Sequence, residues 1–119
     1  MLRYICRMIT NELLKGTLKT ILLNLLAEHG RMYGYEIVQK VREQSNGAFQ
    51  LTEGALYPAL HKLEADGLLV TEKEMIGKRA RKYYRLTPAG SEAKATKVTE
   101  FKAFVQAMQL LLNPKTAAG

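Results

Sequence analysis

The sequence has 119 residues, and its 18 lysines and arginines against 11 acidic residues give a formal net charge of +7 at pH 7. This length accommodates one hydrophobic core, so we expect a single domain over residues 1–119. Hydrophobic residues make up 47% of the chain and charged residues 24%, which excludes a disordered protein. The excess of positive charge favours an acidic partner, with nucleic acid first and an anionic membrane surface second.

Several classes of protein are excluded by what the chain lacks. Its longest apolar block, residues 21–27, is too short to cross a bilayer, and no apolar run with a cleavage site follows the first residues. We therefore expect a cytoplasmic protein without a membrane partner. The single cysteine, Cys6, excludes an internal disulfide and a cysteine-based metal cluster. Phosphate-binding glycine loops, metal-binding helix motifs and nucleophile motifs are absent, so we expect no enzymatic activity, no metal and no cofactor.

Two helices are predicted first. One begins at Asn11, a good capping residue, repeats apolar residues at close to 3.6 positions and ends at Gly30. Its apolar stripe is wide, so we expect it to contact the core on one side and a further surface on the other. The second helix covers about residues 35–44 and ends at the turn signal of residues 45–47.

A third helix is predicted from the capping residue Thr52 to Gly67. Its core-facing stripe consists of Leu56, Ala59, Leu60 and Leu63. Pro58 lies past the first turn, where it should disturb the backbone, but the apolar pattern continues through it.

Two extended segments follow, at about residues 69–75 and 81–86, with Gly77 between them, which is typical of a β-hairpin. The last helix begins with Thr87 as its cap and Pro88 at its first position, and it ends at about Leu112. This order predicts a mainly α fold with a small β-hairpin. We interpret about residues 11–87 as a winged helix-turn-helix, and about 88–112 as a C-terminal dimerisation helix.

The third helix is the expected DNA-reading element, because the second helix of such a motif enters the major groove with its N-terminal end. On a helix of 100° per residue, Gly54, Pro58 and His61 lie opposite the leucine stripe. Long polar side chains are few on this face, so shape and phosphate contacts should dominate over base readout. The residues predicted to contact DNA here are Thr52, Gly54, Ala55, Tyr57, Pro58, His61 and Lys62.

Alternative interpretations stay open for these residues. Gly54 and Ala55 are also small enough to serve packing, and Tyr57 is equally compatible with a half-buried place in the core. An exposed helical histidine such as His61 commonly has no specific task.

The hairpin tip is the second predicted DNA contact. Residues 77–85 read GKRARKYYR and contain five of the 18 basic residues without one acid. A tip of this charge attracts a phosphate backbone or a narrow minor groove, although a solvated charged turn is the alternative. The residues predicted to contact DNA are Lys78, Arg79, Arg81 and Lys82. Each phosphate neutralised should steepen the log–log salt dependence of binding by about 0.9.

The last helix carries an apolar seam with spacings of 3, 4, 3 and 4, made of Val98, Phe101, Val105, Met108 and Leu112. Phe104 and Leu111 widen this seam. A helix of about 25 residues is roughly 37 Å long, more than a small winged helix can cover. We therefore expect a homodimer, with packing against its own domain as the alternative. The predicted interface, which includes the outer face of the first helix, consists of Leu14, Leu18, Val98, Phe101, Val105, Met108 and Leu112. A two-fold dimer would place its recognition helices ~34 Å apart and favour palindromic double-stranded DNA.

Four stretches of the sequence resemble the PadR family of bacterial transcriptional regulators, named for the phenolic acid repressor. They are ELLKGTLKTILLNLLAEHG (12–30), MYGYEI (32–37), LTEGALYPALHKLEADGLL (51–69) and GKRARKYYRLTPAG (77–90), and the family pattern begins near Met8, after residues 1–7. The short last helix is similar to that of the compact subfamily with one C-terminal dimerisation helix. The resemblance implies a homodimer that represses its own or neighbouring genes and is released by a small aromatic or cationic effector.

The resemblance also implies a candidate effector pocket at the dimer centre. Some compact family members stack a tryptophan of the last helix on a flat aromatic ligand, and Phe101 stands at that position here. Val105 replaces the acidic residue one turn on, so the site lacks the charge that would attract a cation. Phe101 and Val105 therefore belong either to an effector pocket or to the dimer core.

Two other classes of function compete with a DNA-binding regulator. Winged helices also serve as protein-interaction modules, in which case the hairpin charges would be incidental. Alternatively, the chain is a small-molecule sensor whose interface pocket is its main activity and whose DNA binding is secondary. RNA is a weaker candidate because the basic surface has no aromatic stacking platform of the usual kind.

Overall fold

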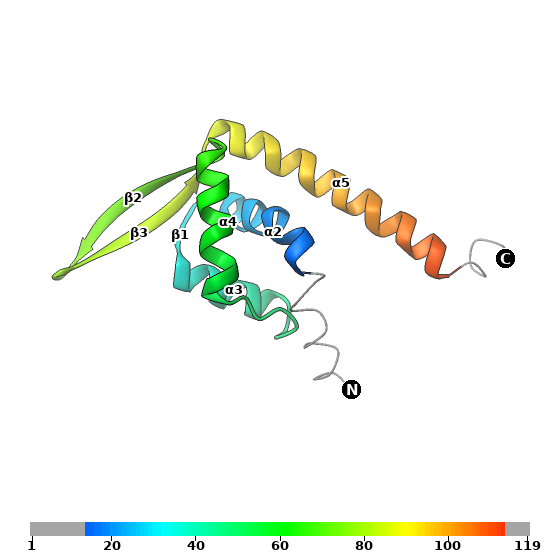
Figure 1. The fold of residues 1–119 in the computed structure, drawn as a ribbon, viewed down its shortest axis with the longest axis horizontal. Coiled ribbons are helices and arrows are strands. Elements are labelled where there is room, and N and C mark those ends of the chain that lie inside the picture. The colour runs from blue at the N-terminus through cyan, green and yellow to red at the C-terminus, as the bar shows by residue number, and fades with distance from the viewer. Residues whose placement is uncertain (1–13, 114–119) are drawn as a thin grey trace.

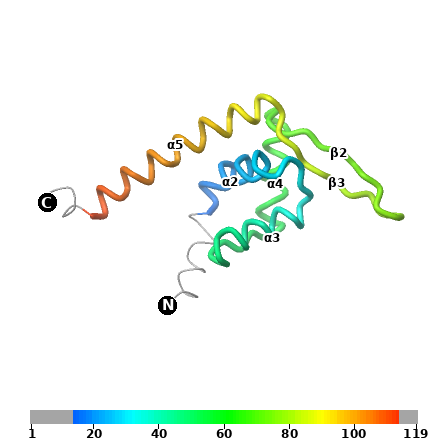
Figure 2. The backbone as a smooth tube through the Cα atoms, turned by 180° about the vertical axis from the view of Figure 1, so that it is seen from behind, coloured from blue at the N-terminus to red at the C-terminus, as the bar shows by residue number. Residues whose placement is uncertain are grey.

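The computed structural model describes residues 14–113 as a small central body with one projection on each side (Figure 1). The elements are α2 (Leu14–His29), β1 (Arg31–Tyr33), α3 (Gly34–Gln44), α4 (Glu53–Ala65), β2 (Leu69–Ile76), β3 (Arg79–Leu86) and α5 (Pro88–Leu112). In Figures 1 and 2 the helices α2, α3 and α4 form the body, the β2–β3 hairpin extends from one side, and α5 runs away on the other. This arrangement confirms the predicted mainly α winged helix-turn-helix.

Helix α2 is the centre of the core and contacts β1, β3, α4 and α5. Its buried residues are Leu14, Leu18, Leu22, Leu23, Leu25 and Leu26. The wide stripe is thus covered largely by the chain itself. Leu14 and Leu18 are only 4% and 7% exposed, which leaves almost no surface for a partner, so their predicted place in a dimer interface is not supported. The predicted helix start at Asn11 lies outside the described residues.

Helix α4 begins after Thr52 as predicted, ends at Ala65, two residues before the predicted Gly67, and is continuous through Pro58. The Thr52 hydroxyl oxygen accepts a hydrogen bond from the Ala55 amide at 3.2 Å, as expected of a cap. An interior proline costs about 3 kcal/mol, whereas each buried leucine contributes about 1.5–3 kcal/mol. The fully buried leucines on the opposite face therefore outweigh the disturbance expected from Pro58; they are Leu56, Leu60 and Leu63.

The sheet has three antiparallel strands in the order β1–β3–β2, and β1 was not predicted. β1 has only three residues, too few to show a two-residue alternation. Its Met32, 3% exposed, pairs opposite Tyr84, 2% exposed, and so closes the core beside β3. Strands β2 and β3 extend beyond the prediction to Ile76 and Arg79, which leaves a two-residue turn. Its first residue, Gly77, has φ +64°, a conformation that favours glycine.

Helix α5 begins as predicted, with the Thr87 hydroxyl oxygen accepting a hydrogen bond from the Gly90 amide at 3.0 Å and Pro88 at the first position. Gly90 is buried against the backbone carbonyl of Leu68, which a Cβ atom would strike. Gly90 is also the only buried residue of this 25-residue helix. Most of α5 is therefore exposed in the single chain. None of the described helices is long and apolar enough to cross a membrane.

Candidate nucleic-acid interface

The outer face of α4 is exposed as the helical periodicity predicts. Gly54, Pro58 and His61 all point away from the core, and Ala55 and Lys62 beside them are exposed as well. A Cβ atom at Gly54 would meet nothing nearer than the Thr52 hydroxyl oxygen at 4.0 Å. Packing within the described chain therefore gives no reason for glycine at this position. A bare helix end remains, whose free amide groups a phosphate can approach.

Tyr57 takes the half-buried place in the core that was one of the two interpretations of its position. Its side chain is half-buried and packs against the core cluster. Its hydroxyl lies against Gly34 at the start of α3, so close that a Cβ atom on Gly34 would collide with it. The ring therefore belongs to the core while the hydroxyl reaches the surface between α3 and α4.

One face of the sheet holds a ladder of paired charges and aromatic rings. Strand pairing sets Glu72 beside Tyr83 and Glu74 beside Arg81, and the Arg85 Nε atom lies 3.3 Å from a Glu72 carboxylate oxygen. The Arg31 guanidinium from β1 forms an ion pair with Glu74. These pairs tie β1 to the hairpin and fix how the hairpin, the wing of the fold, leaves the body.

Cation–π contacts continue the same ladder. The Arg31 guanidinium lies 4.0 Å from the ring centroid of Tyr83, and that of Arg81 lies 4.1 Å from the ring centroid of Tyr33. A hydrogen bond with Tyr83 raises the pKa of Arg81 further above its already high value, so Arg81 stays charged. At the wing tip, Lys78 and Arg79 form no ion pair with any described residue.

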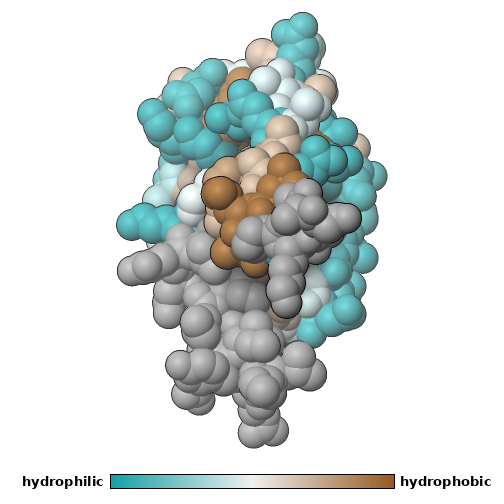
Figure 3. Space-filling view, turned by 90° about the vertical axis from the view of Figure 1, so that its right-hand side faces the viewer, coloured by the Kyte–Doolittle hydropathy of each residue, from teal (hydrophilic) through white to brown (hydrophobic). Residues whose placement is uncertain are grey.

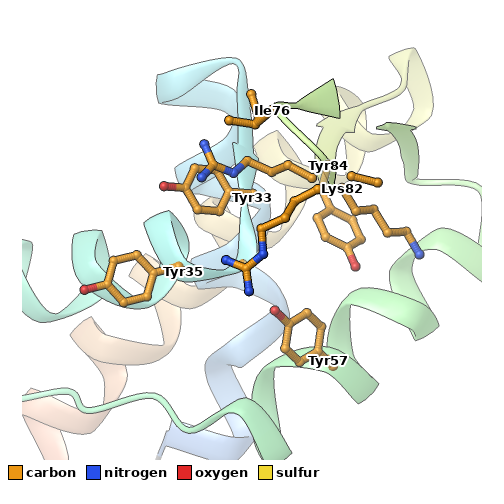
Figure 4. Close-up of a pocket in the computed structure, with 10 residues that line it drawn as sticks. Tyr33, Tyr35, Tyr57, Ile76, Lys82 and Tyr84 are labelled. Atoms are coloured by element: carbon orange, nitrogen blue, oxygen red, sulfur yellow. The ribbon is translucent and has the colours of Figure 1, made fainter. Parts of the chain in front are cut away.

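A cavity of about 400 Å³ lies between the wing, the start of α3 and α4 (Figure 4). The tyrosines Tyr33, Tyr35, Tyr57 and Tyr84 and the cations Arg79, Arg81 and Lys82 all line it, with Gly34, Ile76 and Ala80. It therefore brings one predicted residue of α4, Tyr57, together with three predicted residues of the wing. Thr52, Gly54, Ala55, Pro58, His61, Lys62 and Lys78 lie outside its lining.

Sequence reasoning missed the tyrosines on the α3 side and on β3. Tyr35 is 64% exposed at the start of α3, although most tyrosines of the described chain are at least half-buried. The sequence signal for Tyr33 and Tyr35 is the aromatic–glycine–aromatic segment at residues 33–35, which was noted only as part of the resemblance to the PadR family. Tyr84 is buried on β3, and burial, helped by nearby Tyr57 and Glu64, raises the pKa of its hydroxyl. It is therefore a neutral hydrogen-bond donor at physiological pH.

The seam of α5 is only partly covered by its own chain. Phe101 and Val105 are 37% and 36% exposed, and Leu112 is 71% exposed. Figure 3 looks toward the C-terminal end of α5 and shows a hydrophobic patch on this side of the molecule. A second, largely apolar groove of about 370 Å³ lies between α2 and α5, and Phe101 lines it with Ile21, Phe49 and Val98. Val105 is not part of that lining.

No group of His, Cys, Asp or Glu side chains within residues 14–113 is placed to hold a metal ion. Charge, aromatic hydroxyls and a bare helix end are therefore the chemical means that this surface offers to a ligand.

Comparison with known proteins places this arrangement among bacterial regulators. Residues 22–96 match the model of the transcriptional regulator PadR-like family. A stretch of 52 residues is 52% identical to the transcriptional regulator Rv3488 of Mycobacterium tuberculosis, covering 44% of this chain and 49%, about half, of that protein.

Solved structures agree with this match. A transcriptional regulator from Clostridium thermocellum superposes with a TM-score of 0.76 at 31% identity, covering 82% of this chain and 94% of that one. A PadR family transcriptional regulator from Eggerthella lenta superposes with a TM-score of 0.77 at 29% identity, covering 92% of this chain and 94% of that one.

Proposed function

Because this chain belongs to the PadR-like family of transcriptional regulators, we propose that it binds operator DNA as a homodimer and represses its own or neighbouring genes until a small-molecule effector releases it. The observation that carries the proposal is the cavity at which α4 meets the basic wing. A reading helix and a cationic hairpin on one surface match the two contacts that a winged helix makes with a duplex.

In this proposal, positive charges contact the phosphates and the shape of α4 allows a close approach to the duplex. Lys78 and Arg79 at the wing tip are without a protein partner in the described chain and are free to neutralise phosphates. Lys62 forms an exposed pair with Asp66 at 3.6 Å, which is weak enough for a phosphate to replace. Gly54 lets the end of α4 come close to the duplex. Direct base readout falls to His61 and the few polar side chains near it.

The dimer part of the proposal rests on α5. The exposed Phe104, Leu111 and Leu112 of α5, at 57%, 74% and 71%, form an apolar surface that a monomer would leave in water. A second copy of the seam covers that surface and pairs two wings and two α4 helices for a palindromic operator. Leu14 and Leu18 are nearly covered within the single chain, so we do not include them in the proposed interface.

The effector part rests on the groove between α2 and α5. Its lining of Ile21, Phe49 and Phe101 suits a small aromatic molecule better than an ion. A ligand there would contact α5, the helix proposed to set the distance between the two DNA-binding halves. If Phe101→Ala removes effector binding and leaves DNA binding intact, the effector pocket is assigned to Phe101; loss of DNA binding as well would assign Phe101 to the dimer core.

Charge reversal tests the DNA-binding surface. We expect Arg79→Glu combined with Arg81→Glu to abolish specific binding to a duplex from upstream of the gene, measured by gel shift. Lys15→Glu combined with Lys19→Glu makes the same change in net charge and should retain binding, because both lysines are exposed on α2, which lies in the central body and is not part of the wing (Figure 1). An equal loss of DNA binding in both double variants would mean that net charge alone, and not the position of the charges, explains the binding. Full binding by the wing variant would favour the protein-interaction module instead.

A further inference from the structure

We propose that the cavity between the wing, α3 and α4 binds one phosphate group of the DNA backbone, held by the Tyr84 hydroxyl and the Lys82 ammonium. This inference rests on the proposed function and names the chemical group that the surface takes at one point. It assigns a binding role to Tyr84, which is otherwise a residue of the hydrophobic core.

The first argument is the unused hydroxyl of Tyr84. The residue is 2% exposed, yet its hydroxyl makes no hydrogen bond with any described residue. Every fully enclosed side-chain oxygen or nitrogen among the described residues has a partner, so the Tyr84 oxygen must meet the open space of the cavity. In Figure 4 the Tyr84 side chain descends from β3 toward Tyr57 on α4. A buried donor without a partner is costly unless a ligand or water accepts its bond.

The second argument is the charge of the lining. Arg79, Arg81 and Lys82 all border the cavity, and none of its lining residues is acidic. The Lys82 ammonium lies 5.5 Å from the ring centroid of Tyr84, on the same face of β3. Arg81 is already stacked on Tyr33 and Arg79 stands at the first position of β3 by the wing tip, whereas the Lys82 ammonium lies beside the Tyr84 ring. Lys82 is therefore the cation that we assign to a ligand beside Tyr84.

The third argument is the kind of donors present. The Tyr57 and Tyr84 hydroxyls are neutral donors, and Lys82 donates with a full charge, so the set suits an oxyanion that accepts several hydrogen bonds. A volume of about 400 Å³ admits a sugar–phosphate unit as well as the phosphate itself. A backbone strand that passes between the wing and α4 would place a phosphate here.

The test combines protein variants with altered DNA. Phosphates of the upstream duplex are replaced one at a time by neutral methylphosphonates, and affinity is measured by fluorescence anisotropy. The variants are Tyr84→Phe and Lys82→Gln. The matched control for Tyr84→Phe is Tyr83→Phe, because Tyr83 directly precedes Tyr84 on β3, faces the opposite side and does not line the cavity. The matched control for Lys82→Gln is Lys73→Gln, because Lys73 pairs with Lys82 across the hairpin and does not line the cavity.

We expect one position at which the methylphosphonate lowers wild-type affinity about tenfold, the size of one charge-assisted hydrogen bond. At that position the loss should disappear in Tyr84→Phe and Lys82→Gln and persist in both controls. A loss that persists in Tyr84→Phe and Lys82→Gln at every position overturns the proposal while leaving specific DNA binding intact.

Failure of the proposed function has a different signature. In that case the wild-type protein would not prefer the upstream duplex over a scrambled one, and no methylphosphonate position would stand out. Calorimetric titration with inorganic phosphate then distinguishes a phosphate of the DNA backbone from a free phosphate ion. Binding that Lys82→Gln abolishes and Lys73→Gln retains would assign the cavity to a free oxyanion and overturn the DNA assignment.

Discussion

Gly54 separates, at the scale of a single residue, what folding requires from what binding requires. Its missing side chain faces open space, so alanine should fit and should stabilise α4 by up to about 1 kcal/mol. The same methyl group would lie at the helix end that we propose approaches DNA. We predict that Gly54→Ala raises the urea midpoint and lowers operator affinity. Lower stability with unchanged affinity would contradict the placement of this helix end at the duplex.

Gly90 is the opposite case. A methyl group there would strike the Leu68 carbonyl, so Gly90→Ala should destabilise the fold by about 1–3 kcal/mol. Gly16 in α2 has no atom within 4 Å of its missing Cβ, and Gly16→Ala should be neutral or stabilising. Urea unfolding of the two variants gives the comparison. Equal effects in both would mean that the start of α5 does not pack against Leu68 as described.

Sequence reasoning works best for residues whose environment is set by their own helix. The exposure of Pro58 and His61 follows from the leucine stripe of α4, because helical geometry fixes which side faces out. The burial of Leu14 and Leu18 was not expected, because α2 is enclosed from several directions by the rest of the fold, which the periodicity of one helix does not reveal.

At the scale of elements, the helix caps were the most predictable features. Thr52 and Thr87 form the side-chain hydrogen bonds that their positions suggested, since a cap needs only the next three residues. Strand β1 was missed because its three residues become a strand only by pairing with β3. Its register also builds the ladder of Arg31, Tyr33 and Tyr83, which therefore had no signal in the sequence.

Helix α5 gives the prediction at this scale. In the proposed dimer, glutamates on the seam would have to be buried against a second copy, so Val105→Glu with Leu112→Glu should convert that dimer to a monomer. The control is Ala103→Glu, which places a glutamate on the same helix at an exposed position off the seam. It should leave the proposed dimer intact. Sedimentation velocity measures both. A wild-type chain that sediments as a monomer would contradict the proposed use of α5.

At the scale of the whole molecule, element order alone predicted the fold class, because three helices before a hairpin permit few topologies. The cavity beneath the wing was not predictable, since it depends on how the hairpin curves over α3 and α4. The groove between α2 and α5 depends likewise on how two distant segments cross. Phe101 was predicted to line an effector pocket only by resemblance, and Ile21 and Phe49, which line the groove with it, were not predicted.

A two-fold dimer also constrains its operator. The two recognition helices should read half-sites about one helical turn apart, or a multiple of it. Insertion of five base pairs between the half-sites turns one to the opposite side of the duplex. We predict an affinity loss of about a hundredfold, because only one half then engages. Insertion of ten base pairs provides the control for length, and identical affinity for both insertions would argue against simultaneous engagement.

Binding to the region upstream of the gene tests the central claim most directly. Fluorescence anisotropy compares that duplex with a scrambled one at several salt concentrations, with the full chain. The account predicts a clear preference for the upstream duplex that survives near-physiological salt, with a salt slope of about 0.9 for each phosphate contacted. Equal, weak binding to both duplexes that vanishes with modest salt would contradict it, because the net charge of +7 alone would then explain the attraction.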